Sequence, residues 1–200
     1  MGERSPRESV SSRPLEIDDL YEVRLISDVA ISPDGIRTAF VRKDLDRESD
    51  DTRSNVYLVD SNRTLIQFTT GNKDSAPRWS PDGRWLAFLS GRQEKPQIYL
   101  LSTAGGEGVA LTDLPLGAGL PVWSPDSRFI AFVAQVSTEP HDDKSDDGKA
   151  TPAKITERAS YKLDGVGYIG DRRRHIYVVD IESRSVRQLT DGDCHDDNPS

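Results

Sequence analysis

Apolar residues recur in short runs along the chain, and each run follows a turn of nearly constant sequence. Residues 84–89 read Arg-Trp-Leu-Ala-Phe-Leu, so an extended chain would place apolar side chains on both of its sides. Residues 36–41 and 128–133 follow the same pattern. Strands that are apolar on both faces are covered on both faces. The pattern therefore predicts three strands that each lie between neighbouring layers.

The turn before each run is Ser-Pro-Asp-Gly at Ser32 and Ser80 and Ser-Pro-Asp-Ser at Ser124. Proline sets φ for the second position of a β-turn, aspartate accepts local hydrogen bonds, and glycine tolerates a left-handed exit. Successive turn prolines are separated by 48 and then 44 residues. A period in this range indicates a repeat architecture.

Two other phrases recur with the same period, and they predict two more strands in each repeat. Residues 55–60, 97–102 and 175–180 give the third strand of the repeat, and 65–71, 108–113 and 186–192 give the fourth. A four-stranded antiparallel meander of about 40–45 residues is typical of a β-propeller blade. A small residue recurs at Ala39, Ala87 and Ala131, which suits close approach of a neighbouring sheet. The predicted fold is therefore all-β, with blades of four antiparallel strands.

The predicted blades lie at about residues 29–70, 78–112 and 121–190, after a disordered tail at 1–14. Residues 191–200 resemble the linker that follows blade 1, so they predict the start of a fourth blade. A propeller closes with roughly four to eight blades. We therefore expect a partial propeller that stops before closure and belongs to a longer protein.

Blade 3 carries an insertion at 135–174, where blade 2 needs only residues 91–96. The first half of the insertion is polar, and the second contains an Asp164-Gly165 turn that predicts a hairpin. Together with the leading segment 19–35 and the repeated turns, the phrase at 161–180 resembles the N-terminal propeller of the prolyl oligopeptidase family of serine peptidases. The acylaminoacyl-peptidase and dipeptidyl-peptidase-like branch is the most similar.

This resemblance implies a two-domain peptidase for short peptides, in which the propeller docks on a C-terminal α/β-hydrolase domain and gates access to it. The hydrolase domain would carry the Ser, Asp and His of the catalytic triad, with the serine in a Gly-x-Ser-x-Gly motif. No such motif occurs in these 200 residues. We therefore carry over no catalytic residue, and we do not expect this segment to hydrolyse peptides by itself.

The turn motif is shared with TolB-like propellers, so a non-catalytic propeller that binds protein partners is the alternative hypothesis. Such propellers are typically exported, whereas residues 1–30 lack the apolar centre of a secretory signal. That absence predicts a cytoplasmic protein, and the insertion in blade 3 also favours the peptidase. A shortened product without function remains a third possibility.

Charge and composition narrow the classes of partner. The net charge is −8 and the isoelectric point about 4.9, which argues against a nucleic-acid partner. No stretch approaches the roughly 20 apolar residues of a membrane span, so no membrane partner is expected. A single cysteine, Cys194, excludes an internal disulfide and fits a reducing compartment.

The candidate contact residues are Arg172, Arg173 and Arg174 at the end of the insertion, which are expected to contact substrate or the hydrolase domain, because guanidinium groups pair well with carboxylates. The alternative is a surface loop whose arginines are solvated and contact no partner. Residues 143–148 begin like a calcium loop, but Lys154 stands where a bidentate Glu is needed. Residues 191–197 contain Cys194, His195 and four aspartates without a second ligand pair, so a polar linker is expected there. No metal or cofactor is predicted.

Overall fold

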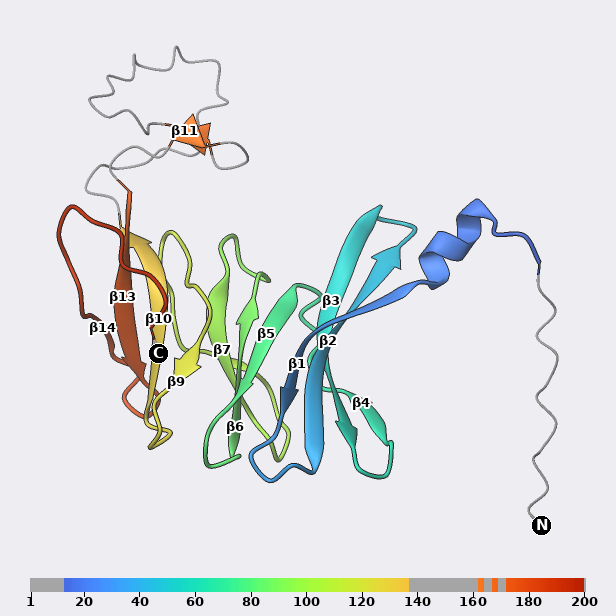
Figure 1. Ribbon diagram of the computed structural model, residues 1–200, viewed down its shortest axis with the longest axis horizontal. Coiled ribbons are helices and arrows are strands. Elements are labelled where there is room, and N and C mark those ends of the chain that lie inside the picture. The colour runs from blue at the N-terminus through green and yellow to red at the C-terminus, as the bar shows by residue number, and fades with distance from the viewer. Residues whose placement is uncertain (1–12, 137–161, 164–166, 169–171, 200) are drawn as a thin grey trace.

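The repeats form separate four-stranded antiparallel sheets, which lie side by side in Figure 1. This computed structural model describes residues 13–136, 162–163, 167–168 and 172–199. Blade 1 contains β1 (Arg24–Ile31), β2 (Arg37–Asp46), β3 (Asp51–Asp60) and β4 (Leu65–Gln67). Blade 2 contains β5 (Asp74–Trp79), β6 (Trp85–Ser90), β7 (Gln97–Ser102) and β8 (Val109–Ala110). Blade 3 contains β9 (Val122–Trp123), β10 (Phe129–Val136), β13 (Arg173–Asp180) and β14 (Val186–Gln188).

Two smaller elements complete the described chain. A 3-10 helix, η1 (Ile17–Glu22), precedes blade 1, and β11 (Lys162–Leu163) pairs with β12 (Gly167–Tyr168). The predicted all-β fold of four-stranded blades is confirmed, and the three sheets do not close into a ring. The described part of the chain has no helix with the length and hydrophobicity needed to traverse a bilayer.

The Ser-Pro-Asp turns fold in the same way in each blade. In blade 2, the Ser80 hydroxyl donates to Asp82 at 2.6 Å and accepts the N–H of Trp85 at 2.9 Å. The Gly83 N–H closes the turn on the Ser80 carbonyl, with φ of +71° at the glycine. Ser127 replaces this glycine in blade 3 at φ +60°, and its hydroxyl accepts the Asp82 N–H of blade 2 at 3.0 Å. The departure from glycine therefore creates a bond between two blades.

The first strands of blades 1 and 2 begin earlier than the predicted blade starts at 29 and 78. β1 begins at Arg24 and β5 at Asp74. The register shifts once in the β1–β2 pair and once in the β5–β6 pair, and the strands are paired on both sides of the shift. Asp28 and Ala76, both at φ +51°, lie within these irregularities. A bulge inserts an unpaired residue and interrupts the alternation of side chains. The hydrophobic pattern therefore ends at the bulge, whereas the strand continues past it.

Two apolar clusters hold neighbouring blades together. One cluster joins Ala39 and Val41 of blade 1 to Leu86 and Phe88 of blade 2. The other cluster joins Ala87 and its neighbours, on the opposite face of blade 2, to blade 3. Ala39 and Ala87 are fully buried, so the recurring small residue does lie where two sheets meet. Burial on both faces of the middle blade agrees with the sequence pattern.

Tryptophan side chains add a polar bond to each of these interfaces. The Trp79 indole N–H of blade 2 donates to the Ala30 carbonyl of blade 1 at 3.0 Å. The Trp123 indole of blade 3 donates in the same way to the Arg78 carbonyl of blade 2, also at 3.0 Å. Besides packing against the apolar clusters, each of these tryptophans therefore forms a hydrogen bond to the preceding blade.

The three sheets share two distinct ends (Figure 1). Antiparallel pairing puts the Ser-Pro-Asp turns at one end, here called the turn end. The connections between blades and the β2–β3 loop lie at the other, called the linker end. At the linker end of blade 3, Gln135 pairs with Arg174 and Val136 with Arg173, so both ends of the predicted insertion belong to the ladder. The predicted tail up to residue 12, the calcium-like loop at 143–148 and the Asp164-Gly165 turn lie outside the described residues.

Candidate functional site

Polar and charged side chains that lie outside the apolar core are found at the linker end. In every blade the third strand carries a buried polar residue towards this end: Asn55, Gln97 or His175. Asn55 accepts the Asn72 N–H at 2.9 Å, and Gln97 accepts the Leu114 N–H at 3.1 Å. These side chains tie each blade to the segment that leaves it. Sequence reasoning explained the three positions only as polar strand ends.

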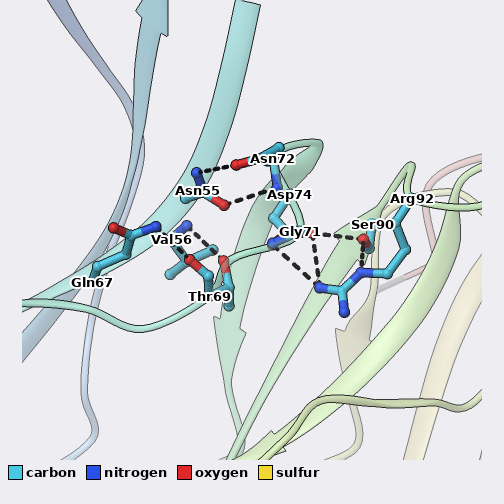
Figure 2. Close-up of polar contacts among 9 residues, drawn as sticks. All are labelled: Asn55, Val56, Gln67, Thr69, Gly71, Asn72, Asp74, Ser90 and Arg92. Atoms are coloured by element: carbon cyan, nitrogen blue, oxygen red, sulfur yellow. Dashed lines mark hydrogen bonds and ion pairs between the residues drawn. The ribbon is translucent and has the colours of Figure 1, made fainter.

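The first connection, residues 68–73 between β4 and β5, leads directly into a fully buried carboxylate, Asp74 (Figure 2). Asp74 has no exposed surface, and its carboxylate accepts the Ser90 hydroxyl at 2.6 Å and the Gly71 N–H at 3.0 Å. A Cβ atom on Gly71 would collide with the Asp74 carboxylate and with Arg92, so the close approach requires glycine. The carboxylate therefore joins the connection to the second strand of blade 2.

Arg92 completes this network from the β6–β7 loop. Its guanidinium lies 3.3 Å from the Asp74 carboxylate and 4.6 Å from the centre of the Tyr99 ring. Its Nε also donates to the Ser90 hydroxyl at 2.8 Å. Ion pairing and contact with an aromatic face both favour arginine over lysine. Sequence analysis did not single out Asp74 or Arg92, because their partners lie up to 18 residues away in the chain.

The outgoing segment, residues 189–199 after β14, is held at the same end of blade 3 by the predicted arginines. Arg173 donates through Nε to Asp193 at 2.8 Å, and Arg174 lies 2.9 Å from Asp197. Arg172 is half-buried, and its carbonyl accepts a hydrogen bond from the Arg173 side chain at 2.9 Å. The structure therefore brings Arg173 and Arg174 onto aspartates of the outgoing segment.

The two histidines near this segment have defined contacts. His175 Nδ1 lies 3.0 Å from Asp196, and the His195 ring accepts the Arg174 N–H at 3.2 Å. The hydrogen bond from His175, together with one from the Thr190 hydroxyl, lowers the pKa of Asp196. Cys194 is exposed, with its sulfur 3.9 Å from Asp196. The acidic run therefore acts as a polar linker, as the sequence analysis expected.

The chemistry available at the linker end is recognition by charge and hydrogen bonding. Within the described ranges, no group of three or more His, Cys, Asp or Glu side chains is arranged to hold a metal ion. The exposed carboxylates and guanidinium groups of the outgoing segment and β13 face solvent at their outer edges. Such groups suit contact with a polar protein surface or a peptide terminus.

The family of the chain follows from a match to a family model. The model of the TolB β-propeller domain matches residues 25–157. The chain belongs to this family. Among curated relatives, an uncharacterized peptidase, YuxL of Bacillus subtilis, is 34% identical over 179 residues, which are 86% of this chain and 27% of the relative.

Solved structures support the same fold. The acylaminoacyl peptidase of Pyrococcus horikoshii matches with a TM-score of 0.66 at 19% identity, over 84% of this chain and 25% of that protein. The β-propeller domain of the trilobed protease of Pyrococcus furiosus matches with a TM-score of 0.54 at 16% identity, over 83% of this chain and 42% of that one. The predicted resemblance to the propeller of prolyl oligopeptidase-type peptidases is confirmed, and the chain spans about a quarter of the length of its peptidase relatives.

Proposed function

We propose that the chain is the propeller portion of a serine peptidase that acts on short peptides, and that it gates and docks on a C-terminal α/β-hydrolase domain. The observation that carries this proposal is the 34% identity to a peptidase over 86% of the chain. The propeller fold supports it, because a ring of blades admits only narrow substrates. The absence of a Gly-x-Ser-x-Gly motif from these residues assigns the chemistry to the partner domain.

The docking part of the proposal concerns Arg172, Arg173 and Arg174 at the linker end. Arg174 keeps about half of its side chain exposed while it pairs with Asp197, so its guanidinium has free donor positions for a second carboxylate. Asp193 and Asp197 hold β13 and the outgoing segment together, which fixes the position of the arginines. This arrangement supports a contact surface for the hydrolase domain or for the carboxylate of a peptide.

The test begins with the native polypeptide in its source cells. A fluorophosphonate probe that reacts with active-site serines should label a protein well above 22.2 kDa that antibodies to this chain also detect. The labelled protein should hydrolyse acyl-peptides of a few residues and spare folded proteins. A native protein of about 22.2 kDa without a labelled partner would refute the peptidase proposal.

The arginines are then tested in that labelled protein. Arg172→Ala, Arg173→Ala and Arg174→Ala should each lower kcat/KM for short peptides by about tenfold if an ion pair to substrate or hydrolase is lost. Arg187→Ala, on the exposed β14 strand of the same blade, is the matched control. Unchanged kcat/KM in all three variants would show that these arginines serve only blade 3.

A TolB-like binding propeller is the second candidate, and the family match favours it as directly as it favours a peptidase propeller. This function predicts no serine-probe labelling of any polypeptide that contains the chain. It also predicts a stable complex with one protein partner that survives purification. The probe experiment therefore separates the two candidates.

A further inference from the structure

A pocket of about 400 Å³ lies between blades 1 and 2 at the turn end. Its apolar lining consists of Leu58, Ile66 and Phe68 from the outer part of blade 1, and Arg37 at the start of β2 also lines it. The facing side is the β7–β8 turn of blade 2, residues 103–106. Positions 105 and 106 are glycines at φ +105° and +117°, and a Cβ atom on either would meet no other atom within 4 Å. Both blades belong to this chain, so a longer protein would keep the pocket.

The groove between blades 2 and 3 is built in the same way, but it is filled. The repeat position of Arg37 is aromatic in the other blades, Trp85 in blade 2 and Phe129 in blade 3. The position of Thr103 is occupied by Ile181 in blade 3. Trp85 and Ile181 both pack against the apolar cluster between blades 2 and 3. The pocket therefore exists because an arginine and a threonine replace the large apolar pair that closes the next groove.

The two turns that face these grooves are equivalent in their backbone, so this comparison is between matching positions. The Thr103 N–H donates to the Arg84 carbonyl in blade 2, and the Ile181 N–H donates to the Arg128 carbonyl in blade 3, each at 3.0 Å. The Thr103 hydroxyl also donates to the Gly83 carbonyl at 2.9 Å, which holds the β7–β8 turn against the Ser-Pro-Asp-Gly turn. One wall of the pocket is thus a fixed part of the repeat.

The Arg37 guanidinium is positioned by blade 2 and keeps donors for a ligand. It donates to the Thr103 carbonyl at 3.2 Å, and its carbon lies 5.1 Å from the centre of the Trp79 ring. None of the described residues forms an ion pair with it. A guanidinium carries five N–H donors in a planar fork that matches a carboxylate. Arg37 is therefore a fixed cation whose natural counterpart is an anion from outside the described chain.

The carboxylate that lines the same pocket has a role in the fold. Asp60 accepts the N–H groups of Asn62 at 2.9 Å and Thr64 at 2.8 Å. Asp180, at the same repeat position in blade 3, accepts two N–H groups of its own turn in the same way. Asp60 therefore shapes the β3–β4 turn, and its negative charge disfavours ligands that carry several negative charges. A ligand with a single carboxylate fits this balance better than a phosphate does.

We propose that this pocket binds the C-terminal end of a peptide whose last residue is apolar, with its carboxylate on Arg37 and its last side chain against Leu58 and Phe68. A volume of about 400 Å³ lies within the range of about 300–1,000 Å³ that small ligands occupy. The main chain of residues 103–106 offers N–H and C=O groups to the rest of the peptide. This site goes beyond the proposed function, because it lies at the turn end and the docking surface lies at the linker end.

The first test compares two peptides on the natural-length polypeptide that contains this chain, after treatment with a fluorophosphonate to block any active-site serine. The probes are N-acetyl-glycyl-glycyl-leucine and its C-terminal amide, titrated by calorimetry. The acid should bind at one site, and the amide should bind at least about tenfold more weakly because it lacks the charge. N-acetyl-triglycine, which lacks the apolar side chain, should also bind about tenfold more weakly. Inorganic phosphate should not compete. Equal affinity for acid and amide, or no binding of the acid, would overturn the proposal.

Matched variants of the same polypeptide locate the site. Arg37→Gln should weaken binding of the acid at least about tenfold and leave binding of the amide unchanged. Arg37→Trp installs the residue that blade 2 carries at this position, so it should fill the pocket and abolish binding of both peptides. Arg128→Gln changes an exposed turn-end arginine of blade 3 and should have no effect. Thermal unfolding checks that the variants stay folded. An Arg37→Gln protein that binds both peptides as the unmodified protein does would contradict the assignment.

The failure of this proposal is distinguishable from the failure of the proposed peptidase. A polypeptide that no serine probe labels, but that binds the acid through Arg37, would refute the peptidase and support the pocket. A labelled peptidase that binds the acid only while its serine is unblocked would support the peptidase and overturn the pocket.

Discussion

The first connection and the outgoing segment occupy the same place in the first and third repeats, and their carboxylates differ in burial. Asp74 anchors the first connection with no exposed surface, and its partners are a hydroxyl, a main-chain N–H and an arginine (Figure 2). Asp193 and Asp197 hold the outgoing segment to Arg173 and Arg174 as ion pairs whose carboxylates are exposed, although the Arg173 side chain is only 11% exposed.

In each segment a main-chain hydrogen bond joins the third strand to the chain that leaves the blade, with donor and acceptor exchanged between the two. The Ser54 N–H donates to the Asn72 carbonyl at the first connection, and the Asp196 N–H donates to the Arg174 carbonyl at the outgoing segment. Ala76 and Asn198 stand at the same repeat position, with φ of +51° and +58°. The repeat thus fixes the path of the chain, whereas the carboxylate that holds it is fully buried at the first connection and partly exposed at the outgoing segment.

The largest expected effect is the loss of the buried carboxylate at the first connection. Asp74→Ala leaves the Ser90 hydroxyl, the Gly71 N–H and Arg92 without their shared acceptor, which should cost about 2–3 kcal/mol. Asp193→Ala removes a carboxylate that is 67% exposed and should cost less than Asp74→Ala, although its partner Arg173 is only 11% exposed. Urea denaturation at one protein concentration measures both variants. Equal losses would contradict the distinction between the two segments.

The second effect concerns the tryptophan bond that both internal interfaces share. Trp79→Phe keeps most of the aromatic volume but removes the donor to the Ala30 carbonyl, which should cost about 1 kcal/mol. Trp123→Phe should cost a similar amount, since the Arg78 carbonyl is bonded at the same distance. Thermal unfolding of the two variants gives the comparison. A large difference between them would show that the two interfaces are not equivalent.

The third effect separates backbone strain from bonding at Ser127. Ser127→Ala keeps a side chain at φ +60° and loses the bond to the Asp82 N–H, so it should destabilise by about 1 kcal/mol. Ser127→Gly loses the same bond but relieves the left-handed backbone, so it should be nearly neutral. The free energies of unfolding of the two variants are compared directly. A glycine variant as unstable as the alanine variant would show that the backbone carries no strain there.

The smallest effect is the pH response of the outgoing segment. The pKa of Asp196 is lowered in the folded chain, chiefly by the hydrogen bond from His175. Its contribution to stability is therefore complete above the unfolded pKa, about 3.9, and is lost as the pH falls through the lower folded value. Asp196→Asn should flatten the pH dependence of unfolding below about pH 4. An unchanged acid profile would contradict this assignment.

The sequence predicted the repeated unit well because its signals are local. The Ser-Pro-Asp turn, the apolar run after it and the segment that predicts the third strand each contain fewer than ten residues, and they fold as expected in the three blades. The start of β1 was missed because the bulge at Asp28 breaks the alternation on which strand prediction depends. The first and last residues of the predicted insertion proved to be paired strand residues for a related reason, since the ladder extends past the apolar run.

The contacts at the linker end were harder to predict because they join distant residues. Nothing local distinguishes Asp74, which is buried, from Asp193, which is exposed; the difference arises in the folded chain. Arg173 and Arg174 were chosen for their place at the end of the blade 3 insertion and for the family resemblance, and the structure adds their aspartate partners. These contacts could have been predicted from an arginine-rich strand start and an aspartate-rich linker that fall at the same end of the repeat.

The most direct test of this account is hydrogen exchange at the four amides of Ser54, Asn72, Arg174 and Asp196, measured at low and high salt. At each place one of the two amides donates to a main-chain carbonyl and the other to a side chain: Ser54 to Asn72 and Asn72 to Asn55 at the first connection, Asp196 to Arg174 and Arg174 to His195 at the outgoing segment. The account predicts that Ser54 and Asn72 exchange slowly at both salt concentrations, whereas Arg174 and Asp196 exchange faster and speed up further when salt screens their ion pairs. Equal protection of both pairs, with no response to salt, would contradict the claim that the burial of its carboxylate sets the behaviour of each connection.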